Sequence, residues 1–333
     1  MSRARSSAAA VLAAALAVLA TAAPAPAGLG DLLDKIRDRV STVLLAEDLL
    51  VEPGADVTLR ASLRSGLRLS GIAGTRIQFH LEGERLGQEA SDQDGNVAVA
   101  WRAPDAPGDY VIRVRVKPDD QPERPVDETR LLVAVRKPDA AVVVVDLDKT
   151  VVASGFARVL VGGARPMEGA AVVMQRLAKD HTIVYLTHRP DFLGSSSKAW
   201  LTDNGFPAGP VLTSTIGSFA SGSGTYKAGR LDVLKRTYKN LVVGIGDKTS
   251  DARAYAERGL RSILILGVDW SEDDPEDFEK LAAELAALPE TVQVVTNWSE
   301  VAAILFEKAS SPKQAMEKRL RETAHSLRRR GKD

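Results

Sequence analysis

The hydrophobic pattern of this chain changes its period once, near residues 137–139, and no other feature constrains the fold as strongly. Before this point apolar and polar side chains alternate, as they do in strands that bury one face. After it, residues 140–145 read AAVVVV, a continuous apolar run that is typical of a strand buried on both faces. We therefore expect two regions of different architecture on either side of Lys137-Pro138-Asp139.

The first region, residues 45–136, consists of short alternating runs with turn signals before and between them. The runs occupy residues 57–63, 77–81, 97–101, 110–116 and 131–135. The turn-forming pairs are Pro53-Gly54, Asp94-Gly95 and Pro107-Gly108. No helical pattern interrupts the runs, so this region predicts a small antiparallel all-β sandwich, and it contains no group of residues that suggests catalysis.

In the second region, residues 139–307, strand and helix patterns alternate. Strands are expected at residues 140–145, 182–186, 241–245, 262–266 and 291–295. Helices are expected at residues 168–180, 195–204, 227–237, 250–258, 275–287 and from 298 onward. This alternation predicts an α/β domain with a doubly wound parallel sheet, in which ligands bind at the carboxyl ends of the strands.

Candidate functional residues follow the predicted strands at this edge of the sheet. In chain order they are Asp146, Asp148, Thr150, Thr187, His188, Arg189, Lys227, Asp247 and Asp251. A DxDxT run such as residues 146–150 has little specificity alone. Its place after a buried strand, followed by three further polar strand ends, predicts a functional site rather than a set of surface carboxylates.

The composition decides which chemistry this set can perform. The chain has no cysteine and four histidines among 333 residues, which excludes disulfide scaffolds, thiolate zinc sites and cysteine nucleophiles. Asp146, Asp247 and Asp251 offer the hard oxygen ligands that Mg²⁺ prefers. A carboxylate beside such an ion can attack a phosphoryl group and form an aspartyl-phosphate.

The other members of the set complete a phosphoryl-transfer site. Asp148, two positions after Asp146, is placed to protonate the leaving oxygen and then to deprotonate the attacking water. Thr187 and Lys227 can bind the non-bridging phosphate oxygens, whose charge must be matched in the transition state.

Taken together, these motifs resemble those of the haloacid dehalogenase-like phosphohydrolases, over about residues 139–305. The resemblance implies that Asp146 is the nucleophile and Asp148 the general acid and base. It also implies a magnesium site, with Asp247 and Asp251 as ligands beside these two aspartates. Thr187 and Lys227 would be the phosphate-binding residues of the same family pattern.

A narrower resemblance concerns the second motif and the segments just after it. The relevant segments are YLTHRP at residues 185–190, Trp200-Leu201, GFP at 205–207 and GPVL at 209–212. Over about residues 141–270 they are similar to the lipin-type phosphatidate phosphatases, which implies phosphatidate at a membrane surface as the substrate. Thr150, His188 and Arg189 are then further candidates for phosphate contact, although Arg189 has the alternative of pairing with an acidic neighbour such as Asp191.

Substrate size bears on the same question. The segments 151–186 and 188–226 leave no room for a large cap domain after the core helices are subtracted, so a capless, open site is expected. An open site suits a bulky substrate such as a protein, a nucleic-acid end or a lipid headgroup. The alternative is a phosphatase for a small, non-lipid phosphomonoester, capped by the neighbouring sandwich.

The sandwich region has a resemblance of its own, carried by its turn segments. VEPGADV at residues 51–57, SDQDG at 91–95 and PGDY at 107–110 resemble bacterial immunoglobulin-like modules. A different class of function therefore stays open, in which the sandwich is an adhesive or binding module and the α/β domain is a non-catalytic binder. The complete set of Asp, Thr and Lys positions favours the enzyme.

The two ends of the chain differ in composition from its middle. Residues 1–27 predict a secretory signal, with Arg3 and Arg5 before an uncharged run and a small-residue cleavage pattern. Export would end in the periplasm, the envelope or the medium. Residues 28–44 are expected to be a linker, and residues 308–333 a basic tail that is solvated or docks on anionic lipid. Lys+Arg and Asp+Glu are equal at 44, which argues against a nucleic-acid partner.

Overall fold

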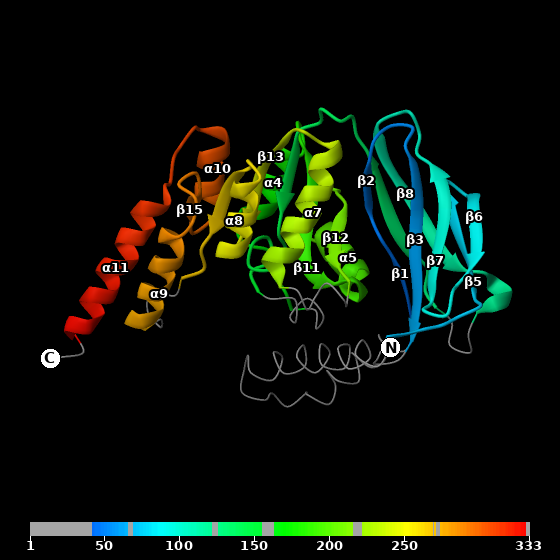
Figure 1. Cartoon of the computed structure of the whole chain (residues 1–333), viewed down its shortest axis with the longest axis horizontal. Helices are drawn as coiled ribbons and strands as arrows, with labels where there is room; N and C mark the ends of the chain where they lie inside the picture. The colour runs from blue at the N-terminus through cyan, green and yellow to red at the C-terminus, as the bar shows by residue number, and fades with distance from the viewer. Residues whose placement is uncertain are drawn as a thin grey trace.

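The computed structural model describes residues 42–65, 69–121, 126–154, 163–215, 222–268, 270 and 274–330. The expected signal segment 1–27 lies outside these described residues. Figure 1 shows two regions along the chain, a β-rich region in blue and cyan, and a region of mixed strands and helices in green to red. We refer to them as the β region, residues 42–135, and the α/β region, residues 142–330.

The β region contains two sheets that enclose one apolar core. Its strands are β1 (Thr42–Ala46), β2 (Leu49–Val51), β3 (Asp56–Ser65), β4 (Ser70–Gly71), β5 (Arg76–Leu81), β6 (Glu84–Ala90), β7 (Asn96–Arg102), β8 (Gly108–Val116) and β9 (Thr129–Val135), with a short 3₁₀ helix η1 (Pro118–Asp120). One sheet contains β1, β3, β4 and β7, and the other has the order β2-β9-β8-β5-β6. Leu59 from the first sheet and Phe79 and Ile112 from the second are fully buried in the shared core.

The alternating runs of the sequence correspond to β3, β5, β7, β8 and β9. Two details of the β region differ from expectation. The strand β1 begins at Thr42, inside the segment expected to be a linker. The predicted antiparallel pairing also has an exception, because β2 pairs with β9 in parallel, with Leu49 opposite Val133. A parallel pair is possible here because β2 and β9 lie at opposite ends of the β region's sequence, so the long connection between them is available.

The α/β region is built on a parallel sheet. Its strands are β10 (Val142–Val145), β11 (Thr182–Pro190), β12 (Val211–Ser214), β13 (Leu241–Gly246), β14 (Arg261–Ile265) and β15 (Gln293–Val295). They lie in the order β12-β11-β10-β13-β14-β15, and each neighbouring pair is parallel. Consequently the carboxyl ends of β10, β11 and β13 meet at one edge of the sheet.

Helices pack on both faces of this sheet. They are α4 (Ala170–Leu177), η2 (Asp191–Leu193), α5 (Gly194–Asp203), α7 (Ser223–Thr237), α8 (Thr249–Glu257), α9 (Pro275–Ala286), α10 (Trp298–Phe306) and α11 (Lys313–Arg330). Val143 and Val145 of β10 face the core that contains α4 and α10, whereas Val142 and Val144 face α7 and α8. Burial on both faces explains why this strand reads as a continuous β-branched run.

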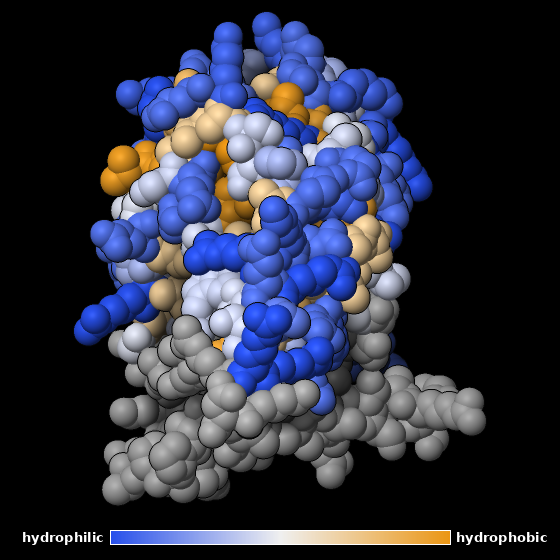
Figure 2. Space-filling model, turned by 90° about the vertical axis from the view of Figure 1, so that its left-hand side faces the viewer, coloured by the Kyte–Doolittle hydropathy of each residue, from blue (hydrophilic) through white to orange (hydrophobic). Residues whose placement is uncertain are grey.

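The basic segment at the end of the chain is not a solvated tail. Residues 313–330 form α11, which packs against α9 and buries Met316, Leu320 and Ala324. Figure 2 views the end of the molecule that lies at the left in Figure 1, where these two helices are found, and its described surface is mainly hydrophilic, with scattered apolar groups. Several α11 cations on this face are paired, for example Arg328 with Glu279 of α9. No helix in the described part of the chain is both long and apolar enough to cross a membrane.

Candidate functional site

Three carboxylates converge at the carboxyl edge of the parallel sheet. Asp146 follows β10, Asp247 follows β13, and Asp251 lies in the first turn of α8. Each contributes an oxygen to a group whose atoms all lie within 4.8 Å of one another. Asp146 is 3% exposed and Asp251 is fully buried, so these charges are held together with little water around them.

The ammonium group of Lys227 lies among these carboxylates. Its Nζ is 3.0 Å from Asp146 Oδ1 and 2.5 Å from Asp251 Oδ2, and the side chain is 1% exposed. Burial alone would lower the pKa of Lys227, but attraction to Asp146 and Asp251 outweighs it, so the pKa is raised and the ammonium form is held. Lys227 lies within α7, which begins four residues earlier than the sequence predicts, at Ser223.

Asp247 shows that one cation does not balance this cluster. Burial, reinforced by repulsion from Asp146, raises the pKa of its carboxyl to about 7. Its Oδ1 is buried and accepts no hydrogen bond from any described residue. An uncompensated carboxylate oxygen beside two others is the donor set that a hard divalent cation requires, so these residues fit Mg²⁺.

Glycines allow the elements of this cluster to approach closely. A Cβ on Gly244 of β13 would lie 2.2 Å from Cγ of Tyr255 in α8, and one on Gly246 would lie 3.0 Å from Cβ of Asp251. Any larger side chain at Gly244 would therefore push α8 away from β13. The close packing places Asp251 within reach of Asp146.

Asp148 is expected from the sequence to be a metal ligand with Asp146, Asp247 and Asp251, but it does not join these three carboxylates. Its two oxygens instead accept hydrogen bonds from Arg189, at 3.0 Å from Nε and 2.7 Å from Nη2. Arg189 is 2% exposed, whereas the Asp148 side chain is 21% exposed. The acidic partner of Arg189 is therefore Asp148 and not the neighbouring Asp191.

The threonines and His188 line the same edge. Thr187 is 1% exposed, and its Oγ1 accepts a hydrogen bond from the backbone N–H of Arg189 at 3.2 Å. Thr150 is fully buried, and its Oγ1 has no hydrogen-bond partner in the described part of the chain. The ring of His188 lies 5.7 Å from that of Tyr226. Both threonine hydroxyls keep a proton that can be donated to an anion.

Serines that are not among the predicted site residues also support this edge. Ser197 of α5 accepts a hydrogen bond from Arg189 Nη1, and Ser223 donates one to Asp251 Oδ1. Ser214 of β12 donates to the carbonyl groups of His188 and Arg189. Isolated serines carry no sequence signal, although Ser223 lies in the SGSG run just before Lys227.

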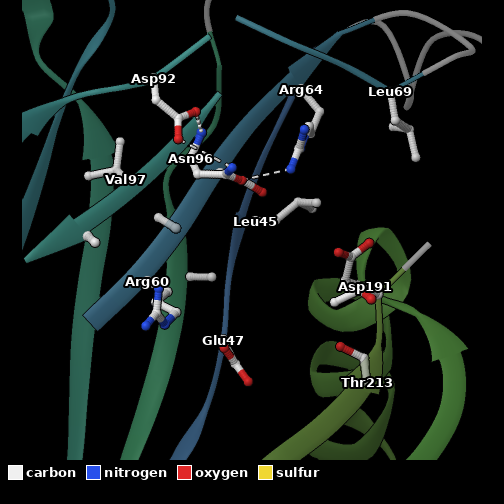
Figure 3. A pocket seen from close by; sticks show the side chains of 15 residues that line it. Leu45, Glu47, Arg60, Arg64, Leu69, Asp92, Asn96, Val97, Asp191 and Thr213 are labelled. Carbon is white, nitrogen blue, oxygen red and sulfur yellow. Dashed lines mark hydrogen bonds between the residues drawn. The ribbon is translucent and has the colours of Figure 1, made fainter. Parts of the chain in front are cut away.

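A groove lies beside this site, between the β region on one side and η2 and the end of β12 on the other. It has a volume of about 570 Å³, and its lining includes Glu47, Arg60 and Arg64 on one side and Asp191, Thr213 and Thr215 on the other. Figure 3 shows Asp191 and Thr213 facing Glu47 and Arg60 across it. The clustered carboxylates and Lys227 do not line it, so the groove and the carboxylate cluster are separate features.

One comparison with known proteins bears on the class of the α/β region. Residues 143–268 match the family model described as the LNS2 domain of PITM 1-3. This domain belongs to the haloacid dehalogenase-like and lipin-type phosphatase class, so the match points to a phosphatase-type enzyme with a phosphorylated substrate. No curated protein matches the chain.

Two of the solved structures that match the chain show distant similarity. The D0-D1 domain of Intimin is 14% identical over 28% of this chain and 45% of its own, with a TM-score of 0.21. A β-glucuronidase of Bifidobacterium dentium, complexed with coumarin-3-O-glucuronide, is 11% identical over 77% of this chain and 44% of its own, with a TM-score of 0.28. The chain therefore spans less than half the length of these structures, and TM-scores at this level do not define a shared fold.

Proposed function

We propose that this protein is a Mg²⁺-dependent phosphomonoester hydrolase that works through an aspartyl-phosphate on Asp146. The observation that carries the proposal is the position of Asp146 at the carboxyl edge of the sheet, 3.0 Å from Lys227 and clustered with Asp247 and Asp251. In this proposal the α/β region is a capless, doubly wound domain of the haloacid dehalogenase-like type. The match of residues 143–268 to a domain of that phosphatase class supports it.

Asp146, Asp247 and Asp251 would hold the metal ion. When bound, Mg²⁺ supplies positive charge that lets a carboxylate nucleophile approach a phosphate dianion. The ammonium group of Lys227 lies beside Asp146 and can bind a non-bridging oxygen of the phosphate that Asp146 attacks. The hydroxyl groups of Thr150 and Thr187 can donate hydrogen bonds to the other non-bridging phosphate oxygens, which stabilises the negative charge of the transition state.

The reaction has two steps that the residues divide among themselves. In the first, an Asp146 oxygen forms a bond to phosphorus while the ester oxygen leaves with a proton from Asp148. In the second, Asp148 takes a proton from water, the water oxygen attacks phosphorus, and the acyl-phosphate bond to Asp146 breaks. Inorganic phosphate is released, and both aspartates return to their starting states.

We propose phosphatidate as the substrate, in line with the lipin-type resemblance and the absence of a large cap between the motifs. The β region would be an immunoglobulin-like module of residues 45–136, followed by the phosphatase domain at 139–307. Residues 1–27 would direct export to the periplasm, the envelope or the medium. A soluble phosphomonoester is the competing substrate class, and a non-catalytic exported binding protein is the competing function.

The test uses the Asp146→Asn variant of the full chain. Both proteins are assayed with Mg²⁺ on phosphatidate vesicles and on p-nitrophenyl phosphate, with Asp203→Asn, an exposed aspartate of α5, as the control. We expect the wild type and the control to release phosphate and the Asp146 variant to release none while keeping its thermal transition. Unchanged turnover in the Asp146 variant would refute the assignment of Asp146 as the nucleophile. Turnover of soluble compounds alone would refute phosphatidate as the substrate.

A further inference from the structure

We propose that Arg189 is a positioning residue, which orients the carboxyl group of Asp148 for proton transfer and does not bind the substrate phosphate. The inference rests on the proposed function, because it concerns the general acid of that reaction. It departs from the interpretation of Arg189 as a phosphate-binding residue, which its place in the YLTHRP segment suggests.

Arg189 and Asp148 form a bidentate ion pair, which we call the fork. Nε and Nη2 of Arg189 point at separate oxygens of Asp148, at 3.0 and 2.7 Å. Two parallel hydrogen bonds between planar groups fix the plane of the carboxylate as well as its distance. A single ammonium group in the same place could attract Asp148 but could not set its orientation.

Arg189 is itself held from several sides. Its Nη1 donates to Ser197 Oγ at 2.8 Å, and its backbone N–H donates to Thr187 Oγ1. Its carbonyl oxygen accepts a hydrogen bond from Ser214 Oγ at 3.1 Å. A substrate phosphate bound through Nε or Nη2 would have to replace the Asp148 carboxylate, which would leave a partly buried charge without its partner, and this is costly.

Asp148 remains able to act on a substrate. A carboxylate has about four lone-pair sites, and the fork uses two of them. The Asp148 side chain is 21% exposed, so part of it is accessible to a substrate while it is paired with the buried Arg189. Asp148 also lies outside the cluster of Asp146, Asp247 and Asp251. The arrangement therefore separates metal binding from proton transfer.

The leaving group provides a selective test of this role. p-Nitrophenolate leaves as a stable anion and needs no proton, whereas an alkoxide leaving group must be protonated as the bond breaks. A change that misorients Asp148 should therefore slow the first step, which kcat/KM reports, far more for alkyl phosphomonoesters than for aryl ones, whereas the second step is common to both. Loss of a phosphate-binding residue would instead raise KM for both.

The experiment measures kcat and KM of the full chain on p-nitrophenyl phosphate and on dioctanoyl phosphatidate or glycerol 3-phosphate, whichever alkyl ester the wild type hydrolyses. The variants are Arg189→Met, Arg189→Lys, Asp148→Asn and the double variant R189M/D148N. Arg261→Met is the matched control, because Arg261 is exposed and opens β14 at the opposite edge of the sheet.

We expect Arg189→Met to lower kcat/KM about 100-fold on the alkyl ester and less than about 10-fold on the aryl ester, without a KM increase for both. The double variant should lose no more than Asp148→Asn alone, because the two residues act as one unit. If Arg189→Met fails to fold, Arg189→Lys replaces it, because it keeps the positive charge beside Asp148. It should show the same alkyl-selective loss.

Equal losses on both esters, a KM increase for both, or additive losses in the double variant would overturn the proposal. Asp146→Asn, run beside these variants, keeps the two proposals apart. If it abolishes both activities while the Arg189 variants lack ester selectivity, only the role of Arg189 fails. If it retains activity, the proposed function itself fails.

Discussion

The carboxylate of Asp48 lies 2.6 Å from Nζ of Lys198, although the two residues belong to different regions of the molecule. Asp48 follows β1 in the β region, whereas Lys198 lies in α5 of the α/β region. The same carboxylate also accepts hydrogen bonds from the backbone N–H groups of Leu132 and Val211. One buried side chain thus joins β9, β12 and α5.

Replacing Asp48 should weaken this junction. In Asp48→Asn the side chain keeps one acceptor oxygen and loses its charge, so at least one buried N–H and the ammonium of Lys198 lose a partner. We expect a loss of about 2–4 kcal/mol in the free energy of unfolding. Urea denaturation measures it, with Glu47→Gln as the control, because the ion pair of Glu47 with Arg230 is exposed. Equal midpoints for the two variants would contradict the expectation.

Lys227 should be required for stability as well as for activity. The Lys227→Met variant removes the ammonium that lies between Asp146 and Asp251 and leaves buried carboxylates uncompensated. Without metal we expect a loss of about 3–5 kcal/mol. Mg²⁺ should recover part of it, because it supplies positive charge at the same place. Thermal melts with and without Mg²⁺ test this, and Lys239→Met, an exposed lysine after α7, should stay within about 0.5 kcal/mol of the wild type.

Magnesium binding itself should be visible in the melting temperature. A ligand at 100 times its Kd stabilises the folded state by about 2.7 kcal/mol. We expect Mg²⁺ to raise Tm in the wild type and not in Asp247→Asn, whose buried Oδ1 would be a ligand atom. Asp148→Asn should keep the increase, because Asp148 is bound to Arg189 outside the cluster. If Mg²⁺ raises Tm in neither Asp247→Asn nor Asp148→Asn, Asp148 would also be a metal ligand.

The carboxylate cluster could be predicted because it depends on topology. Asp146 and Asp247 each follow a buried strand, and parallel neighbours bring such ends together. The Arg189–Asp148 pair could not be predicted, since it depends on how α5 packs and on side-chain rotamers. Nothing in residues 185–190 distinguishes an arginine that faces a substrate from one that faces an aspartate.

Elements were missed where their pattern was weak. The strand β6 (ERLGQEA) lies at the edge of its sheet, and it has no row of buried side chains that would produce an alternating pattern. The strand β12 has four residues and directly follows Gly209-Pro210, a pair that reads as a turn. For α11 the sequence contains an apolar repeat that favours a packed helix, but the many basic residues around it favour a solvated tail. Met316, Leu320 and Ala324 recur every four residues and form the buried face of the helix.

That buried face gives a prediction for the C-terminal helix. Leu320 is fully buried between α11 and α9, so Leu320→Ala should cost about 2–5 kcal/mol by leaving a cavity. Lys318→Ala, on the exposed face, should cost less than about 1 kcal/mol, because its pair with Glu322 is exposed. Chemical denaturation compares them. A similar small effect for both would indicate that α11 contributes little to the fold.

The groove beside the site contains a carboxylate whose replacement should stabilise the protein. Asp191 Oδ1 is buried and accepts no hydrogen bond from any described residue. Burial raises the pKa of Asp191 above its ordinary value, and a hydrogen bond from the backbone N–H of Phe192 and the charge of Arg64 offset this only in part. A carboxyl whose pKa is higher in the folded state binds its proton more readily there, so ionisation costs stability as the pH rises.

The Asp191→Asn variant removes this cost. Near pH 3, where the carboxyl is largely protonated in both the folded and unfolded states, the variant and the wild type should differ little. The advantage of the variant should grow as the pH rises above the unfolded pKa of 3.8, and it should level off above the raised pKa of the folded state. Asp92→Asn is the contrast in the same groove, because Asp92 Oδ1 accepts backbone hydrogen bonds from Asp94 and Asn96 and its replacement should destabilise. Urea midpoints between pH 3 and pH 8 measure both, and an advantage for Asp191→Asn that shrinks with rising pH would refute the assigned cause.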